Sequence, residues 1–135
     1  MKPAKKMLGK RVLVAEDEPE IRMAVYEILS EEGAEVVGVK NGTEALAMVL
    51  ASRFDLVVSD IRMPGGDGPT LLKQMRLALP NPPPLLFISA YFDFSASEAA
   101  RQGACGILRK PFGVTDLLQV VEKVLVETAT EKAEA

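Results

Sequence analysis

The stretch LVVSDIRMPGGDG, residues 56–68, ends an apolar run in a single carboxylate and then breaks all regular structure. A short run of this kind, rich in valine, predicts a strand that is buried on both faces. Asp60 ends the run, and one proline and three glycines follow it within eight residues. Because these residues favour turns, the backbone after Asp60 is free to point a carbonyl at a ligand. A buried strand that carries one charge to its tip predicts a functional side chain there.

The rest of the chain alternates strand and helix patterns. The strands are short and apolar, and the helices repeat apolar residues at i, i+3 and i+4. Five such strand–helix units predict an α/β fold, a parallel five-stranded sheet with helices on both faces. The predicted strands are residues 11–15, 35–39, 55–59, 85–89 and 105–108. The predicted helices are residues 19–32, 43–51, 69–79, 95–102 and 114–126.

The length of 135 residues suits one domain. We expect a basic N-terminal arm at 1–10, the folded domain at 11–127 and a polar, frayed tail at 128–135. The net charge is −3 although five cations lie in the first eleven residues, so the remainder is acidic. An acidic body disfavours direct nucleic-acid binding. No apolar run approaches the ~20 residues that span a bilayer.

The cysteine and histidine counts exclude several kinds of covalent and catalytic site. The single cysteine, Cys105, rules out an internal disulfide and fits a cytoplasmic location; we expect it to be a buried small hydrophobe. The chain has no histidine, which excludes Ser-His and Cys-His catalytic pairs and a histidine-ligated metal.

Polar residues collect where the predicted strands end. Glu16, Asp17 and Glu18 follow the first strand, and Asp60 follows the third. Ser89 ends the fourth strand and Lys110 follows the fifth. Because ligands of such sheets bind outside the carboxyl ends of the strands, we expect these side chains to surround one site.

An all-oxygen site of clustered carboxylates suits Mg²⁺, which keeps water ligands for a phosphate. Two carboxylates on adjacent strands, about 4.8 Å apart, repel by roughly 3 kcal/mol at an effective dielectric near 20. Lys110 adds a charge for a phosphoryl oxygen and Ser89 a hydroxyl donor. This arrangement predicts phosphoryl transfer with Asp60 as nucleophile, forming an aspartyl-phosphate.

The sequence resembles the receiver domain of two-component response regulators. Four motifs carry the resemblance: VLVAEDEPEIR, LVVSDIRMPGGDG, LLFISAY and GILRKPF, which lie within residues 11–112. The resemblance implies a three-layer, doubly wound (βα)₅ flavodoxin-like fold with strand order 2-1-3-4-5. It also implies a phosphoprotein of phosphorelay signalling, not itself an enzyme, that takes its phosphoryl group from a sensor histidine kinase or histidine phosphotransfer protein.

The resemblance assigns a role to each site residue. Asp60 is the implied phosphoacceptor, and Asp60 and Asp17 are implied Mg²⁺ ligands. Glu16 would assist the metal, through water, and the carbonyl of Arg62 would be a further ligand. Ser89 would sense the phosphoryl group and Lys110 would pair with it. The Lys110–Pro111 bond is often cis in this family.

Signalling is expected to pass through one face of the domain. The helix at 95–102 is alanine-rich and weakly packed, so the face that it forms with the strand at 105–108 and the helix at 114–126 is expected to contact a downstream protein. Ile107 stands where many members have an aromatic switch residue, so another readout is expected. We also hypothesise that Arg62 and Tyr91 crowd the path of attacking water and slow dephosphorylation.

Three other functions compete with this interpretation. A phosphorylation-independent interaction module with the receiver fold would not need the complete set of acids, Ser89 and Lys110. A flavodoxin-like cofactor binder would need a phosphate loop where Glu16, Asp17 and Glu18 stand. A phosphohydrolase acting through an aspartyl-phosphate usually has a second acid two residues after the nucleophile, where this chain has Arg62.

Overall fold

The computed structural model describes residues 5–90 and 95–134, with side chains described as far as Glu127. Five parallel strands form one sheet in the order β2-β1-β3-β4-β5, and a helix follows each strand. The predicted doubly wound fold and strand order are therefore confirmed. The strands are β1 (Arg11–Ala15), β2 (Glu35–Val39), β3 (Leu56–Asp60), β4 (Leu85–Ser89) and β5 (Gly106–Arg109). The helices are α1 (Pro19–Glu31), α2 (Gly42–Ala51), α3 (Gly68–Ala78), α4 (Ala96–Gln102) and α5 (Val114–Glu134).

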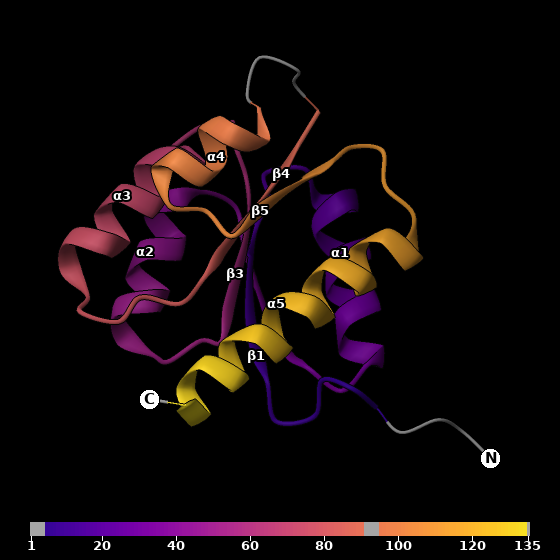
Figure 1. Cartoon of the computed structure of the whole chain (residues 1–135). Helices are drawn as coiled ribbons and strands as arrows, with labels where there is room; N and C mark the ends of the chain where they lie inside the picture. The colour runs from indigo at the N-terminus through magenta and orange to yellow at the C-terminus, as the bar shows by residue number, and fades with distance from the viewer. Residues whose placement is uncertain (1–4, 91–94, 135) are drawn as a thin grey trace.

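Helices cover both faces of the sheet. Figure 1 shows α1 and α5 on one face and α2, α3 and α4 on the other. Successive side chains of a strand point to opposite faces, so the strands contribute to two separate cores. In β1, Val12 and Val14 pack with residues of α1 and α5, whereas Leu13 and Ala15 pack with residues of α2 and α3. With both faces covered, the carboxyl edge of the sheet is the part that remains open for a site.

Side-chain caps fix where three helices begin. Asn41, Asp67 and Ser95 each accept a hydrogen bond from a backbone N–H in the first turn of α2, α3 and α4. Each cap satisfies one donor that a helix leaves unpaired at its start. Gly103 ends α4 in the left-handed region at φ 99°, a conformation that glycine adopts without steric penalty.

The segment before β1 contributes to the core. Met7 is fully buried, and its N–H donates to the carbonyl of Glu32 at 2.9 Å. Leu8 lies over the turn between α1 and β2, where a Cβ on Gly33 would come within 3.0 Å of its side chain. The part of this basic segment that the structure describes is thus attached to the domain.

Two local expectations are wrong. Helix α5 continues to Glu134, past the predicted end at Val126, because the polar tail is built from good helix formers although it lacks apolar periodicity. Cys105 is exposed and not buried, because β5 begins one residue later, at Gly106. Among the described residues, no helix is both long and apolar enough to cross a membrane.

Candidate functional site

The register of the sheet brings the predicted site residues to one edge. β1 and β3 are neighbours, with Ala15 opposite Ser59, so Glu16 and Asp60 leave the sheet side by side. On the other side of β3, Ser89 ends β4 opposite Arg109, the residue before Lys110. The chain turns in opposite directions from β1 and β3, which is where doubly wound sheets open a crevice for ligands.

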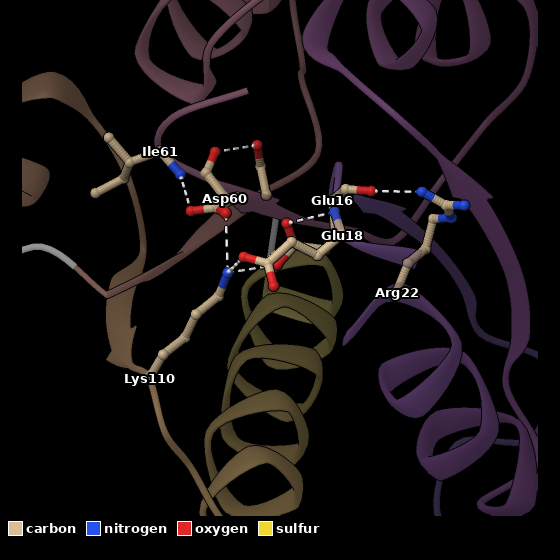
Figure 2. A network of polar contacts seen from close by, with 7 residues as sticks. Glu16, Glu18, Arg22, Asp60, Ile61 and Lys110 are labelled. Atoms are coloured by element: carbon tan, nitrogen blue, oxygen red, sulfur yellow. Dashed lines mark hydrogen bonds and ion pairs between the residues drawn. The ribbon is translucent and has the colours of Figure 1, made fainter. Parts of the chain in front are cut away.

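Lys110 connects two buried carboxylates at the centre of this edge (Figure 2). Its Nζ lies 2.5 Å from Glu16 Oε1 and 2.9 Å from Asp60 Oδ2. The side chains of Lys110, Glu16 and Asp60 are 10%, 0% and 6% exposed. Glu18 Oε1 lies farther away, at 4.0 Å from Nζ, and is mostly solvated. The lysine therefore acts as an internal counter-ion for two acids that water barely reaches.

The backbone around Asp60 holds its carboxylate in one orientation. The N–H of Ile61 donates to Asp60 Oδ1 at 2.7 Å, and the hydroxyl of Ser59 donates to the Asp60 carbonyl at 2.8 Å. Oδ1 is thus held by the main chain, while Oδ2 faces Lys110 and Glu16. One carboxylate oxygen is left directed at the cluster.

Glu16 is positioned by α1. Arg22 Nη1 donates to the Glu16 carbonyl at 2.8 Å, and the N–H of Glu18 approaches Glu16 Oε2 at 3.4 Å (Figure 2). The role of Arg22 was not predicted from the sequence, where it is one polar residue in the first turns of an amphipathic helix. Its only signal was its place four residues after Glu18, one helical turn along.

The electrostatics of the cluster follow from burial. Burial raises the pKa of Glu16 to about 7; the hydrogen bond from Lys110 opposes this shift and the nearby Asp60 adds to it. Burial acts to lower the pKa of Lys110, but its hydrogen bonds to Glu16 and Asp60 outweigh that effect and raise its pKa. Near neutral pH Lys110 is therefore protonated, while Glu16 is present in both its protonated and its ionised form.

The three acids form a donor set that fits a hard divalent cation. One carboxylate oxygen from each of Glu16, Asp17 and Asp60 lies within 4.8 Å of the others. Glu16 and Asp60 are buried and Asp17 is partly exposed, so the cluster opens to solvent on the Asp17 side. Mg²⁺ prefers oxygen ligands and retains several waters, which an opening of this kind accommodates. The donor chemistry therefore agrees with the predicted metal.

The other residues that the sequence analysis singled out lie around this cluster or outside it. Ser89 is fully buried at the end of β4, and Arg62 is exposed just after β3. Ile107 is half-buried in β5 and packs against the core on the α2 and α3 side. The Lys110–Pro111 bond is cis. Tyr91 lies outside the described residues, so the structure does not test its predicted effect on dephosphorylation.

The loop after Asp60 is anchored to the start of α2. The N–H of Gly42 donates to the Gly66 carbonyl at 2.8 Å, and the hydroxyl of Thr43 donates to the Gly65 carbonyl at 2.5 Å. Gly65 and Gly66 have φ of 88° and 140°, conformations that side chains rarely adopt. The glycines of this stretch thus serve a close backbone contact beside the site.

A hollow of about 410 Å³ opens beside Lys110. It lies between the first turns of α1 and the chain after β5, and its lining is mostly apolar. The residues that line it are Glu20, Ile21, Ala24, Val25, Ala90, Lys110, Pro111 and Phe112. Farther along α1, Met23 and Tyr26 are 56% and 42% exposed. The site is therefore bordered by an apolar surface on the α1 side.

Comparisons with known proteins agree with this geometry. A family model described as the response regulator receiver domain matches residues 12–122. The transcriptional regulatory protein PdtaR of Mycobacterium tuberculosis is 38% identical over 115 residues, which cover 84% of this chain and 55% of PdtaR. The chain thus spans about half of that relative's length. The sporulation initiation phosphotransferase F of Bacillus subtilis is 30% identical over 120 residues, which cover 88% of this chain and 96% of that protein.

A solved structure gives the same result. The response regulator TrrA of Thermotoga maritima, in complex with Mg²⁺ and BeF, superposes with a TM-score of 0.77 at 33% identity. The alignment covers 85% of this chain and 98% of TrrA. The fold of this chain is thus shared with a response regulator of known structure.

Proposed function

The chain belongs to the response regulator receiver domain family, and on this premise we propose that Asp60 is its phosphoryl acceptor. The chain is a receiver domain of two-component response regulators. The observation that carries the proposal is the orientation of Asp60, whose Oδ1 is held by the N–H of Ile61 while Oδ2 faces Lys110 at 2.9 Å. A fixed carboxylate with one oxygen directed at a cation is suited to attack a phosphorus atom.

The proposed step is a transfer from a phosphohistidine of the donor protein. Asp60 Oδ2 attacks phosphorus, and the bond between phosphorus and the imidazole nitrogen breaks, with its electron pair passing to that nitrogen. The product is a mixed anhydride on Asp60. Lys110 then donates to a phosphoryl oxygen in place of Asp60 Oδ2, and the hydroxyl of Ser89 donates to another. The released imidazole takes a proton from water.

Asp17, Asp60 and Glu16 would hold Mg²⁺, with the carbonyl of Arg62 as a further ligand and Glu16 acting through water. Receiver domains bind Mg²⁺ at such an acidic pocket. Bound there, the ion supplies positive charge that offsets the charge of the phosphoryl group. The protein's own contribution is to keep Glu16 beside Lys110, so that the site is organised before any ligand arrives.

The donor is a sensor histidine kinase or a histidine phosphotransfer protein that approaches from the α1 side, where the apolar hollow borders Lys110. The new charge recruits Ser89 and Lys110 and shifts the domain between two conformations. A downstream protein reads the change at the face formed by α4, β5 and α5, and no direct nucleic-acid contact is involved. The domain is a cytoplasmic signalling module that assists its own phosphorylation without being an enzyme for other substrates.

Intact-mass measurement after incubation with acetyl phosphate and Mg²⁺ tests the proposal. We expect one added phosphoryl group on the wild type and none on Asp60→Asn. Asp116→Asn is the matched control, because Asp116 is exposed at the start of α5 and asparagine keeps its cap to Gly113. Addition to Asp60→Asn, or no addition to the wild type with Mg²⁺ in excess, would contradict the proposal and favour the phosphorylation-independent interaction module.

A further inference from the structure

A second hollow lies away from the acidic site, between α3 and α4. Its volume is about 630 Å³. Its lining residues are Pro69, Thr70, Lys73, Arg76, Leu77 and Gln102. None of them belongs to the acidic cluster or to its supporting contacts. The two helices that border it, α3 and α4, lie with α2 on one face of the sheet (Figure 1).

The charge of this groove is opposite to that of the domain. The chain has a net charge of −3, yet the charged residues of α3 are two cations, Lys73 and Arg76. Neither cation forms an ion pair with a carboxylate of the described residues, and the six lining residues include no acid. On α4, Glu98 is already occupied, since it pairs with Arg101 at 3.2 Å and accepts from Gln102 Nε2 at 3.1 Å. The groove therefore presents positive charge to solvent.

The same groove exposes an unusually accessible apolar side chain. Leu77 is 78% exposed, the highest value among the large hydrophobic residues that the structure describes. Thr70, Lys73 and Leu77 are spaced i, i+3 and i+7, so they lie on one side of α3. Leu77 follows Lys73 by one helical turn, which places an apolar contact next to a cation.

We propose that the groove between α3 and α4 docks an acidic segment of a partner protein. Carboxylates of the segment pair with Lys73 and Arg76, and an apolar side chain between them covers Leu77 and Pro69. A nucleic-acid strand fits less well, because the groove offers two cations and no aromatic ring on which a base could stack. The proposal concerns a surface remote from Asp60 and goes beyond the proposed function.

One residue of the groove, Arg76, also connects α3 to the end of α4. Arg76 Nη1 donates to the carbonyl of Gln102, the last residue of α4, at 2.8 Å. Its guanidinium lies so close to Gly103 that any Cβ there would overlap it. A carboxylate that binds Arg76 thus engages the residue that connects the end of α4 to α3.

The test uses synthetic amphipathic peptides and the intact chain. The probe is a fluorescein-labelled peptide of glutamate and leucine at helical spacing, and its partner has glutamine for every glutamate. We expect the glutamate peptide to bind the wild type, in fluorescence anisotropy, at least about tenfold more tightly than the glutamine peptide. Amide chemical-shift changes in an NMR titration should centre on Thr70, Leu77 and Gln102.

Variants at exposed positions distinguish binding in the groove from nonspecific electrostatic attraction to the protein. Lys73→Glu should weaken binding of the glutamate peptide by about tenfold or more, and Leu77→Ala by several-fold. Lys123→Glu, an exposed cation on α5, should leave binding unchanged. Equal binding of the two peptides, equal weakening by Lys73→Glu and Lys123→Glu, shifts centred elsewhere, or tighter binding of a single-stranded oligonucleotide would each overturn the proposal.

Discussion

Glu16→Gln should stabilise the metal-free protein, although it removes a residue of the proposed metal site. Glu16 is fully buried, and burial raises its pKa from 4.5 to about 7. That rise in pKa corresponds to about 3 kcal/mol in favour of the neutral form. Glutamine resembles the neutral form and still accepts the hydrogen bond from Lys110.

The sign of the pH dependence follows from the raised pKa. Below pH 4.5 Glu16 is protonated in both the folded and the unfolded chain, so it adds no pH dependence. Between pH 4.5 and about 7 the folded state binds more protons than the unfolded state, so wild-type stability falls as pH rises through this range. The gain from Glu16→Gln should therefore grow from about 1 kcal/mol at pH 5 to about 3 kcal/mol at pH 8.

Urea unfolding followed by far-ultraviolet circular dichroism measures this gain, with EDTA present at both pH values. Glu27→Gln is the matched control, because Glu27 is exposed on α1, and it should change stability by less than about 0.5 kcal/mol. Added Mg²⁺ should stabilise the wild type more than Glu16→Gln. If Glu16→Gln were less stable than the wild type at pH 8, or if its gain were the same at both pH values, the account of the buried cluster would be wrong.

Three further predictions follow from single contacts. Lys110→Met should destabilise the metal-free protein by about 3 kcal/mol or more in urea at pH 8, because Glu16 and Asp60 lose their counter-ion; an unchanged midpoint would refute this. Gly68→Ala should lower the free energy of unfolding by about 1–3 kcal/mol in the same assay, because a Cβ there would overlap the Asp60 carbonyl and press on Phe87. Unchanged stability would contradict the close packing of this loop. Cys105 should react with iodoacetamide roughly 100-fold more slowly at pH 7.5 than a free cysteine. Although part of the residue is exposed, desolvation and, to a smaller extent, the nearby Glu127 raise the pKa of its thiol to about 11; rapid alkylation would contradict this.

The sequence predicted the fold well because the strand signal is strong. In β3 and β4 all five residues are buried. Apolar runs this short are typical of buried strands, because helices in globular proteins are usually longer. The edge of the sheet was predictable for a related reason, since parallel strands deliver their last residues to the same side. The structure does bring Glu16, Asp17, Asp60 and Lys110 together there.

Contacts that depend on side-chain packing were not predictable in the same way. Met7 was assigned to a basic arm because its neighbours in sequence are lysines, yet it fills the end of the core beside α1. The double contact of Lys110 with Glu16 and Asp60 depends on side-chain conformations across 94 and 50 residues of sequence separation, which no local pattern encodes. The continuation of α5 rests on intrinsic helix propensity rather than on the apolar repeat that the prediction used.

Helix α4 is attached to the domain by very little. Ala99 is its one buried residue, and the structure describes all of α4. The hydrogen bond from Arg76 to Gln102 adds an exposed contact of about 1 kcal/mol. In native-state hydrogen exchange, α4 should therefore open locally at a free energy well below that of global unfolding, while β3 and β4 exchange only when the whole domain unfolds. Because α4 opens at so low a free energy, a single new charge worth a few kcal/mol is sufficient to change the balance between its closed and its opened state.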